Sequence, residues 1–330
     1  MLFQNIETID TADQYLDIAF SRAGKQASAI RGRTKGTRLQ KSITIELVRI
    51  KTVTKELSGT LRRIIKTFPS FDDLHIFYQE LIKLHFSIDE LRKALSSLDW
   101  AAGKMQELQS YYSTKIKRCR FYFDVNKVRV EFSGRISSVM KKINRHLLFL
   151  ENARKKIKDF PIVKTRLFTC SICGFPNVGK TTLLSKITKS QPEINVYPFT
   201  TKQINIGYVV SQGQKLQLLD TPGTLNRFDR MNTIEKQAFL AMKFLSDLII
   251  YIFDLTESYP LKDQEKLFNK IKKDFDKPIM LYLSKTDILN KTKEGKEKIK
   301  RFKQEHPKTR IIDNKDKLIN ELIKKKKELL

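Results

Sequence analysis

Cysteine, glycine and acidic residues are scarce in this sequence, and the shortages exclude several classes of protein. Three cysteines in 330 residues cannot build a disulfide framework, so the sequence favours a reducing compartment. No apolar run approaches the roughly 20 residues that span a bilayer. The first residues lack both the basic region and the long apolar stretch of a signal peptide. We therefore expect a cytoplasmic protein without a membrane partner.

Acidic residues are strongly outnumbered by basic ones. The chain has 36 Asp plus Glu and 64 Lys plus Arg, which gives a formal net charge of +28. The excess is shared equally between residues 1–160 and residues 161–330, so it is not the property of one basic tail. Such a charge favours a polyanionic partner, and nucleic acid fits better than an anionic membrane surface.

The first half of the chain has the apolar periodicity of helices. Five stretches share this spacing: residues 11–20, 41–68, 74–86, 88–105 and about 108–158. Thr11 is a plausible helix N-cap, and Phe68-Pro69-Ser70 is a helix breaker. We expect residues 1–160 to form an all-α, antiparallel helical bundle.

The second half of the chain has a different pattern from residue 165 onward. Short β-rich runs alternate with helical segments, which is typical of βαβ units. Six runs have this character: residues 167–173, 203–210, 216–219, 248–253, 279–283 and 310–312. We expect residues 161–330 to form an α/β domain with a mostly parallel sheet and helices on both faces.

A phosphate-binding pattern, G-x-x-x-x-G-K-[ST], occupies residues 174–181 between an expected strand and an expected helix. In such a loop the backbone N–H groups wrap the phosphates, the lysine reaches the β- and γ-phosphates, and the hydroxyl binds Mg²⁺. The residues expected to contact a nucleotide here are Asn177, Val178, Gly179, Lys180, Thr181 and Thr182.

A second phosphate motif, D-x-x-G, follows the expected strand at 216–219. Asp220 can hold Mg²⁺ through water, and the Gly223 amide can contact the γ-phosphate. Between the two motifs, residues 197–202 fit a first switch, in which we place Thr200 at the nucleotide and favour Thr201 as the second Mg²⁺ hydroxyl. The resulting assignments are catalysis for Lys180, Thr201 and Gly223, and Mg²⁺ coordination for Thr181, Thr201 and Asp220.

Base recognition is expected from Ser284-Lys285-Thr286-Asp287, directly after the run at 279–283. The Asp287 carboxylate can accept both N1–H and N2–H₂ of guanine, and the Lys285 stem can cover the ring. Common GTPases have Asn at the position of Ser284, so one supporting hydrogen-bond network is weakened. The last base-contact loop should follow the run at 310–312 and is left unassigned. In this order the motifs predict a Mg²⁺-dependent P-loop domain that binds GTP and GDP.

These motifs resemble those of the nucleolar GTP-binding protein 1 (Nog) family, a branch of the Obg-related GTPases. The resemblance rests on Asn177, on residues 197–202, 220–223 and 232–238, and on residues 11–20 and 68–78 of the helical half. It implies a slow GTPase that acts as a switch in assembly of the large ribosomal subunit. The implied partners are rRNA and the subunit precursor, and we expect a monomer off the ribosome, in the shorter archaeal form. A GTP-binding, RNA-docking protein that does not hydrolyse GTP is the alternative.

The resemblance also bears on hydrolysis. Thr224 stands where many GTPases have the glutamine that orients water, so we expect backbone groups, the switch loops or a ribosomal partner to do so. Asn177 resembles the P-loop asparagine that helps hold K⁺ in some relatives, and a loop-stabilising side chain is the alternative. Arg227 and Arg230, beyond the second switch, reach either the γ-phosphate or RNA, or are solvated.

Basic residues cluster between the first two expected helices: Lys25, Arg31, Arg33, Lys35 and Arg38. We expect them to contact rRNA phosphates, because the glycines among them permit close backbone approach, and a solvated loop is the alternative. Several aromatic residues are interpreted as packing residues rather than base-stacking platforms: Trp100, Tyr111, Tyr112, Phe121 and Tyr122. Cys170 and Cys173 are likewise assigned to core packing, not to metal or redox chemistry.

Overall fold

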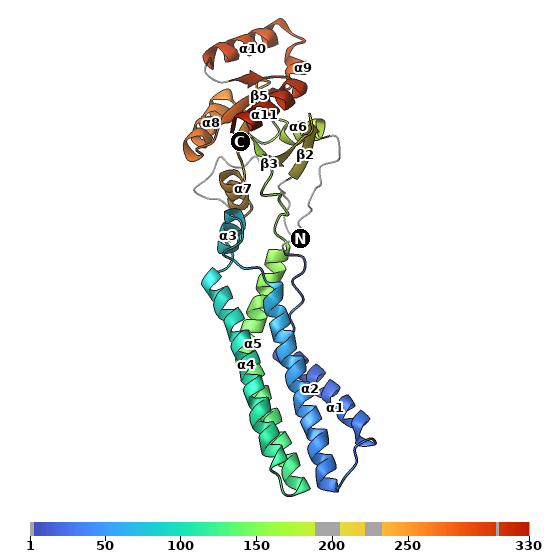
Figure 1. The fold of residues 1–330 in the computed structure, drawn as a ribbon. Helices are drawn as coiled ribbons and strands as arrows, with labels where there is room; N and C mark the ends of the chain where they lie inside the picture. The colour runs from blue at the N-terminus through green and yellow to red at the C-terminus, as the bar shows by residue number, and fades with distance from the viewer. Residues whose placement is uncertain (1–2, 189–204, 222–232, 308–309, 330) are drawn as a thin grey trace. The chain divides into compact units, whose positions relative to one another are not determined.

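The chain divides into two compact units (Figure 1). The computed structural model describes residues 3–188, 205–221, 233–307 and 310–329. The first unit comprises residues 1–74 and 85–160, and the second comprises residues 75–84 and 161–330. Residues 75–84 lie within the range expected for the helical domain, but they belong to the second unit. Within the described ranges, no helix is long and apolar enough to cross a membrane.

The first unit is a bundle of four helices. They are α1 (Ala12–Arg31), α2 (Arg38–Thr67), α4 (Ile88–Lys117) and α5 (Tyr122–Lys158). Helix α2 packs against both α1 and α4, and α4 packs against α5, with the chain running up and down between them (Figure 1). Thr11 and Thr37 begin α1 and α2 with capping boxes, each closed by a glutamine three residues later. The expected antiparallel bundle is confirmed.

The boundary between α4 and α5 differs from the expectation. A break was expected between residues 105 and 108, but α4 continues to Lys117 and the turn falls at residues 118–121. Met105, Tyr112 and Ile116 are all buried and extend one helical stripe, so the polar residues around 106–107 are the exposed face of an unbroken helix.

A largely buried carboxylate on α5, Glu151, binds the N-terminal segment. Glu151 accepts both Nε and Nη2 of Arg154, each at 2.7 Å, and the backbone N–H of Ile9 at 3.0 Å. Burial alone would raise the pKa of Glu151, but these donors outweigh it and hold that pKa below its ordinary value. The carboxylate therefore stabilises the folded unit in its charged form.

The second unit contains a sheet of six strands in the order β2-β3-β1-β4-β5-β6. The strands are β1 (Thr169–Cys173), β2 (Asn205–Ser211), β3 (Gln214–Asp220), β4 (Leu248–Asp254), β5 (Ile279–Ser284) and β6 (Ile311–Ile312). All neighbours are parallel except β2 and β3, which form a hairpin across Gln212 and Gly213. Both residues have positive φ, as a two-residue hairpin turn requires. The mostly parallel sheet is confirmed.

Helices cover both faces of this sheet. The helices of the second unit are α3 (Ile76–Lys83), α6 (Lys180–Ile187), α7 (Thr233–Phe244), α8 (Leu261–Asp274), α9 (Thr286–Leu289), α10 (Lys293–Glu305) and α11 (Lys315–Leu329). On one face the Cys173 sulfur lies 3.5 Å from that of Met242 in α7, and the Tyr251 hydroxyl donates to the Gln264 carbonyl in α8 at 2.7 Å. On the other face Gly207 lies against α6, where a Cβ would come within 2.8 Å of the Leu184 side chain.

The two cysteines of β1 are core residues, as expected. Cys170 and Cys173 are fully buried. Burial raises the pKa of Cys173 to about 12, so its thiol stays protonated and unreactive near neutral pH.

Tyr78 joins helix α3 to residues 161–163 of the second unit by hydrogen bonds. The Tyr78 hydroxyl donates to the Pro161 carbonyl at 2.9 Å and accepts the Val163 N–H at 3.0 Å. The same helix packs against α7. A short helix from the middle of the first half of the chain thus completes the α/β unit.

Candidate functional site

The candidate site lies at the carboxyl ends of four neighbouring strands. Parallel strands present their carboxyl ends at one edge of a sheet, where open α/β folds place their ligands. Ile172 of β1 is in register with Asp220 of β3, and Asp254 of β4 is in register with Ser284 of β5. Motifs more than 100 residues apart in the sequence therefore share one edge.

The loop between β1 and α6 adopts the backbone that its glycines permit. Gly174 has φ +146°, and a Cβ there would lie 2.8 Å from the Ile252 carbonyl oxygen. Gly179 has φ +95° and precedes the first turn of α6. Asn177 is exposed and has φ +62°, a left-handed conformation that asparagine tolerates better than most residues. Val178 is buried, so only its backbone can face a ligand.

Lys180 is folded back over this loop. Its Nζ donates to the carbonyl oxygens of Gly174 at 3.1 Å and Phe175 at 2.6 Å, and the residue is 7% exposed. Burial lowers the pKa of this ammonium, while the nearby Asp220 carboxylate opposes the shift. The ammonium thus lies at the first turn of a helix, where an anion is stabilised by backbone N–H groups and the helix dipole.

Thr181 and Asp220 come together as their assignment to one metal site requires. The Thr181 hydroxyl donates to Asp220 Oδ2 at 2.6 Å, and Asn205 Nδ2 donates to the same oxygen at 3.1 Å. Asp220 Oδ1 is buried and has no hydrogen-bond partner among the described residues. Burial raises the pKa of Asp220, against the hydrogen bonds from Thr181 and Asn205. Mg²⁺ prefers oxygen ligands, and the Thr181 hydroxyl together with the unpaired Oδ1 of Asp220 fits this preference.

Asn205 was not anticipated from the sequence. It is the first residue of β2, and it reaches Asp220 because the two residues are paired across the antiparallel β2–β3 ladder. The alternating pattern of the second half gave no sign that this pair of strands is antiparallel.

The residues expected to recognise the base lie where β5 ends. The Ser284 hydroxyl donates to the Phe253 carbonyl at 3.2 Å, and its Cβ is 3.7 Å from the position a Cβ on Gly179 would take. Lys285 has φ +54° and begins the short helix α9, on which Asp287 is exposed. The base motif therefore lies directly beside the phosphate loop.

Asp254 anchors Lys285, and sequence reasoning missed it. Lys285 Nζ lies 2.6 Å from Asp254 Oδ2, the Ser258 hydroxyl donates to the same oxygen at 3.1 Å, and Thr256 donates its N–H and hydroxyl to Oδ1. Burial alone would raise the pKa of Asp254, but Lys285 and Thr256 outweigh it and lower that pKa. The sequence does contain a signal, because Asp254 is an acidic residue directly after the apolar run 248–253. In the sheet this residue lies next to the base motif.

The loop after β6 also reaches the base motif. The Thr286 hydroxyl donates to the Asp313 carbonyl at 3.3 Å, so this loop lies against α9. Asn314 Oδ1 accepts the N–H groups of Asp316 and Lys317 and caps α11.

Several predicted residues lie outside the described part of the chain. They are Thr200, Thr201, Gly223, Thr224, Arg227 and Arg230. The switch assignments and the second Mg²⁺ hydroxyl therefore stay predictions. Thr182 is described and is exposed in the first turn of α6.

All five basic residues expected to contact RNA are exposed: Lys25, Arg31, Arg33, Lys35 and Arg38. The last four lie at the α1–α2 turn, whereas Lys25 lies within α1, which continues to Arg31. The Arg38 guanidinium lies 4.0 Å from the ring centroid of Tyr122, which brings this turn beside the start of α5. Their contact with RNA stays a prediction.

The interpretation of the aromatic residues as packing residues was wrong for most of them. Trp100 is 46% exposed, Tyr111 60%, Phe121 58% and Tyr122 47%, whereas Tyr112 is buried. Tyr111 and Tyr112 are consecutive, so only one of them can face the core of the bundle. Trp100 likewise lies between the stripe positions Leu98 and Ala101 and points away from them.

Comparison with known proteins agrees with this architecture. Residues 3–164 match the family described as NOG1 N-terminal helical domain, and residues 169–285 match the one described as 50S ribosome-binding GTPase. An uncharacterized protein of Methanocaldococcus jannaschii is 36% identical over 87% of this chain and 81% of its own length. Proteins named nucleolar GTP-binding protein 1 from Drosophila melanogaster and Saccharomyces cerevisiae are each 30% identical over 87% of this chain.

The chain spans less than half of those two relatives, 44% of the fly protein and 45% of the yeast protein. The likeness nevertheless covers both units, from the helical bundle to the base motif. The chain therefore belongs to the nucleolar GTP-binding protein 1 family, in which a NOG1 N-terminal helical domain precedes a P-loop GTPase domain.

Proposed function

We propose that this protein binds GTP with Mg²⁺, hydrolyses it slowly, and acts as a switch in assembly of the large ribosomal subunit, with rRNA as its partner. The match to a 50S ribosome-binding GTPase family and the relatives named nucleolar GTP-binding protein 1 support a ribosomal role. The high net positive charge and the exposed basic α1–α2 turn support an RNA partner.

One observation carries the nucleotide part of the proposal. Lys180, Thr181 and Asp220 converge at the N-terminus of α6, beside the Ser284–Asp287 motif. The phosphate site and the Asp287 carboxylate, which lies on α9 just after β5, together favour a nucleotide whose base carries two adjacent donors, as guanine does.

The residues divide the work as follows. The Lys180 ammonium exchanges its two loop carbonyls for β- and γ-phosphate oxygens. Thr181 and Asp220 would hold Mg²⁺, whose charge offsets that of the phosphates. The Asp287 carboxylate accepts the N1–H and N2–H₂ groups of guanine, while the anchored Lys285 stem covers the ring.

Nucleotide binding is tested with a fluorescent GTP analogue and a matched pair of lysine variants. Lys180→Ala should weaken GTP binding by about 10- to 100-fold, because it removes hydrogen bonds to a charged ligand. Lys186→Ala removes an exposed lysine from the last turn of the same helix and should leave the affinity unchanged. Equal affinity of wild type and Lys180→Ala would refute the phosphate site.

Hydrolysis is tested by phosphate release in K⁺ and in Na⁺ buffers, each with and without large ribosomal subunits. Turnover that rises with the particles supports the switch. Tight GTP binding without turnover in any buffer would instead favour the non-hydrolysing, RNA-docking protein.

The K⁺ role of Asn177 has its own variant. Asn177→Gly keeps the left-handed backbone at φ +62° free of strain and removes only the side chain. If this side chain helps to hold K⁺, the variant should bind GTP normally and lose any stimulation by K⁺. Stimulation that survives the substitution would leave the side chain with a loop-stabilising role.

A further inference from the structure

The exposed aromatic residues of the first unit are not scattered. Trp100 and Tyr111 lie on α4 together with Lys93, Lys104 and Lys115, at alternating spacings of seven and four residues that put them on one face of the helix. At 1.5 Å per residue this face is about 33 Å long. It forms one side of a groove, and α5 forms the other.

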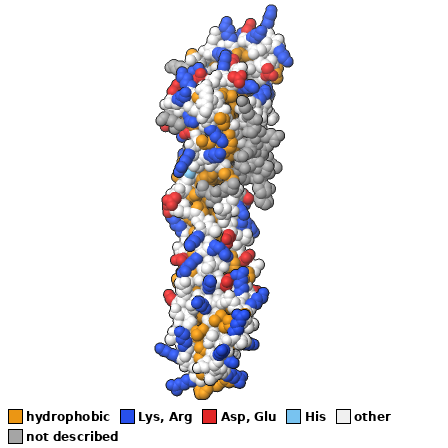
Figure 2. Space-filling view, turned by 45° about the vertical axis from the view of Figure 1, so that its right-hand side comes forward, with side chains coloured by type: hydrophobic (Ala, Val, Ile, Leu, Met, Phe, Trp, Pro, Cys, Tyr) orange, Lys and Arg blue, Asp and Glu red, His pale blue; other side chains and the backbone are white. Residues whose placement is uncertain are grey.

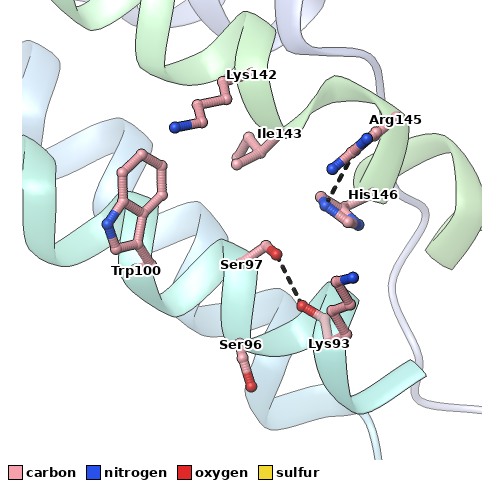
Figure 3. A pocket seen from close by; sticks show the side chains of 8 residues that line it. All are labelled: Lys93, Ser96, Ser97, Trp100, Lys142, Ile143, Arg145 and His146. Carbon is pink, nitrogen blue, oxygen red and sulfur yellow. Dashed lines mark hydrogen bonds between the residues drawn. The ribbon is translucent and has the colours of Figure 1, made fainter. Parts of the chain in front are cut away.

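The groove consists of hollows that share lining residues. One hollow, of about 340 Å³, is lined by Lys93, Trp100, Lys142 and Arg145 among others (Figure 3). The next, of about 470 Å³, shares Trp100 and Lys142 with the first and continues to Tyr111. The hollows therefore follow one another along α4 and α5.

A third hollow, of about 550 Å³, extends the groove to the turn at 118–121. It shares Glu131 with the second hollow and is lined by Arg118, Arg120, Phe121 and Lys127. Beside it the rings of Phe121 and Phe123 stack at 5.4 Å and 10°, and Lys127 Nζ lies 5.4 Å from the Phe123 centroid. Figure 2 shows apolar side chains at the surface of this unit among many lysines and arginines.

One lysine of the groove faces its tryptophan ring. Lys142 Nζ lies 4.9 Å from the Trp100 centroid, from the opposite helix, and Figure 3 shows it pointing toward the indole ring. Among the described residues, no carboxylate lies within ion-pair distance of Lys93, Lys142 or Arg145. Their charges are thus available to a ligand.

We propose that the α4–α5 groove is a binding track for single-stranded RNA, in which unpaired bases stack on Trp100 and Tyr111 while Lys93, Lys142 and Arg145 neutralise the phosphates. This inference takes its RNA partner from the proposed function and adds a site and a class of RNA. Its residues are different from those of the basic α1–α2 turn, which lies beside the start of α5.

The groove fits single-stranded RNA better than other polyanions. Exposed aromatic rings interleaved with cations at regular spacing are the combination that proteins use to bind unpaired bases and backbone together. Duplex RNA hides its bases and would use only the cations. An acidic peptide would also use the cations and would leave the rings without a role.

Trp100 is the only tryptophan of the chain, so its emission reports on the track directly. The full-length protein is titrated with a uridine oligonucleotide of about 12 residues, within the range such sites cover. We expect the emission of Trp100 to be quenched as a base stacks on it. A duplex RNA of the same length and a poly-glutamate peptide should bind more weakly and leave the emission unchanged.

Variants separate the rings from the charges, with RNA binding followed by the anisotropy of labelled oligonucleotide. Trp100→Ala and Tyr111→Ala should each weaken binding by about 5- to 100-fold. Lys142→Ala should lower the slope of log K against log salt by about 0.7. Two control variants, Ile18→Ala and Lys55→Ala, remove an apolar and a charged side chain from exposed positions of other helices. Both should leave the affinity for RNA unchanged.

The opposite results overturn the proposal. Unaltered affinity of Trp100→Ala and Tyr111→Ala, or equal binding of duplex RNA without quenching, would reduce the groove to a general anion surface. If the acidic peptide binds more tightly than RNA, the groove would be assigned to a protein partner instead. GTP affinity is measured on the same preparations, so loss of the proposed nucleotide function would be recognised independently of the track.

Discussion

The ion pair between Asp254 and Lys285 offers a sharp test of how the base motif is held. Asp254 is fully buried, and its carboxylate receives four hydrogen bonds, from Lys285, Ser258 and twice from Thr256. Asp254→Asn keeps the shape of the side chain but removes the negative charge. It also replaces one acceptor oxygen by an NH₂ group that cannot accept a hydrogen bond.

The expected cost follows from the burial of the two partners. Breaking a fully buried ion pair costs about 3–5 kcal/mol. Lys285 keeps 29% of its side chain exposed, so water takes over part of its solvation and we expect a loss nearer 2–3 kcal/mol. Glu257 and Lys298 form a pair in the same region with 50% and 53% exposure. Glu257→Gln should therefore cost less than about 1 kcal/mol.

Urea unfolding of the full chain measures both effects. Trp100 belongs to the first unit, so its emission follows that unit, while far-UV circular dichroism follows both. In Asp254→Asn, the unfolding transition of the second unit, which circular dichroism detects and Trp100 emission does not, should shift to lower urea concentration. The transition reported by Trp100 emission should stay where it is in the wild type. The same variant should weaken GTP binding, because Lys285 is no longer anchored beside Asp287.

A double-mutant cycle with Lys285→Met decides whether the pair is coupled. If Asp254→Asn costs the same free energy of unfolding with and without the lysine, Asp254 acts through the other donors and the argument fails. It also fails if Asp254→Asn and Glu257→Gln are equally mild.

Three further predictions each concern one position of the chain. Asp287→Asn should reduce the preference for GTP over ATP and improve binding of a xanthosine nucleotide, because the C2 oxygen of xanthine accepts a hydrogen bond from the new NH₂ group. Unchanged selectivity in competition binding would show that Asp287 does not recognise the base. Glu151→Gln should destabilise the first unit by about 1.5–3 kcal/mol at pH 7. Because the pKa of Glu151 is lowered in the folded state, the extra stability of the wild type is complete above about pH 4.5 and is lost as the pH falls further. The thermal unfolding temperatures of the two proteins should therefore converge in acid. A difference that stays constant with pH would contradict the charge argument. Gly207→Ala should lower the free energy of unfolding by about 1–3 kcal/mol, because the new Cβ would clash with Leu184 and Thr188. Gly134→Ala, in open space on α5, should instead stabilise the chain by about 0.5–1 kcal/mol. Equal effects of the two substitutions in urea unfolding would refute the packing at Gly207.

Local patterns predicted most of the elements. Apolar spacing of three and four residues gave the helices of the bundle, and the six β-rich runs each became a strand, because both periods are set by backbone geometry alone. The turn between α4 and α5 was misplaced, since no glycine or proline marks it and the stripe through Tyr112 and Ile116 has few apolar members.

The phosphate loop and Asp220 could be found from the sequence because their residues are close together along the chain. The roles of Asn205 and Asp254 could not, because each acts on a residue that only strand pairing brings near, 15 and 31 positions away. The aromatic residues were misjudged for a different reason. Hydrophobicity predicts burial only for residues in phase with the apolar stripe, and Trp100 and Tyr111 are out of phase.

The place of helix α3 affects how this protein can be dissected. The chain passes from one unit to the other at residues 74–75, 84–85 and 160–161. A fragment beginning at residue 161 would lack Tyr78, leaving the Val163 N–H and one side of α7 without their partners. A protease that cuts only near residue 160 would leave α3 covalently attached to the bundle and still bonded to the α/β unit. The two halves of the gene are therefore not two separable folding units, and a GTPase fragment that folds should include residues 75–84.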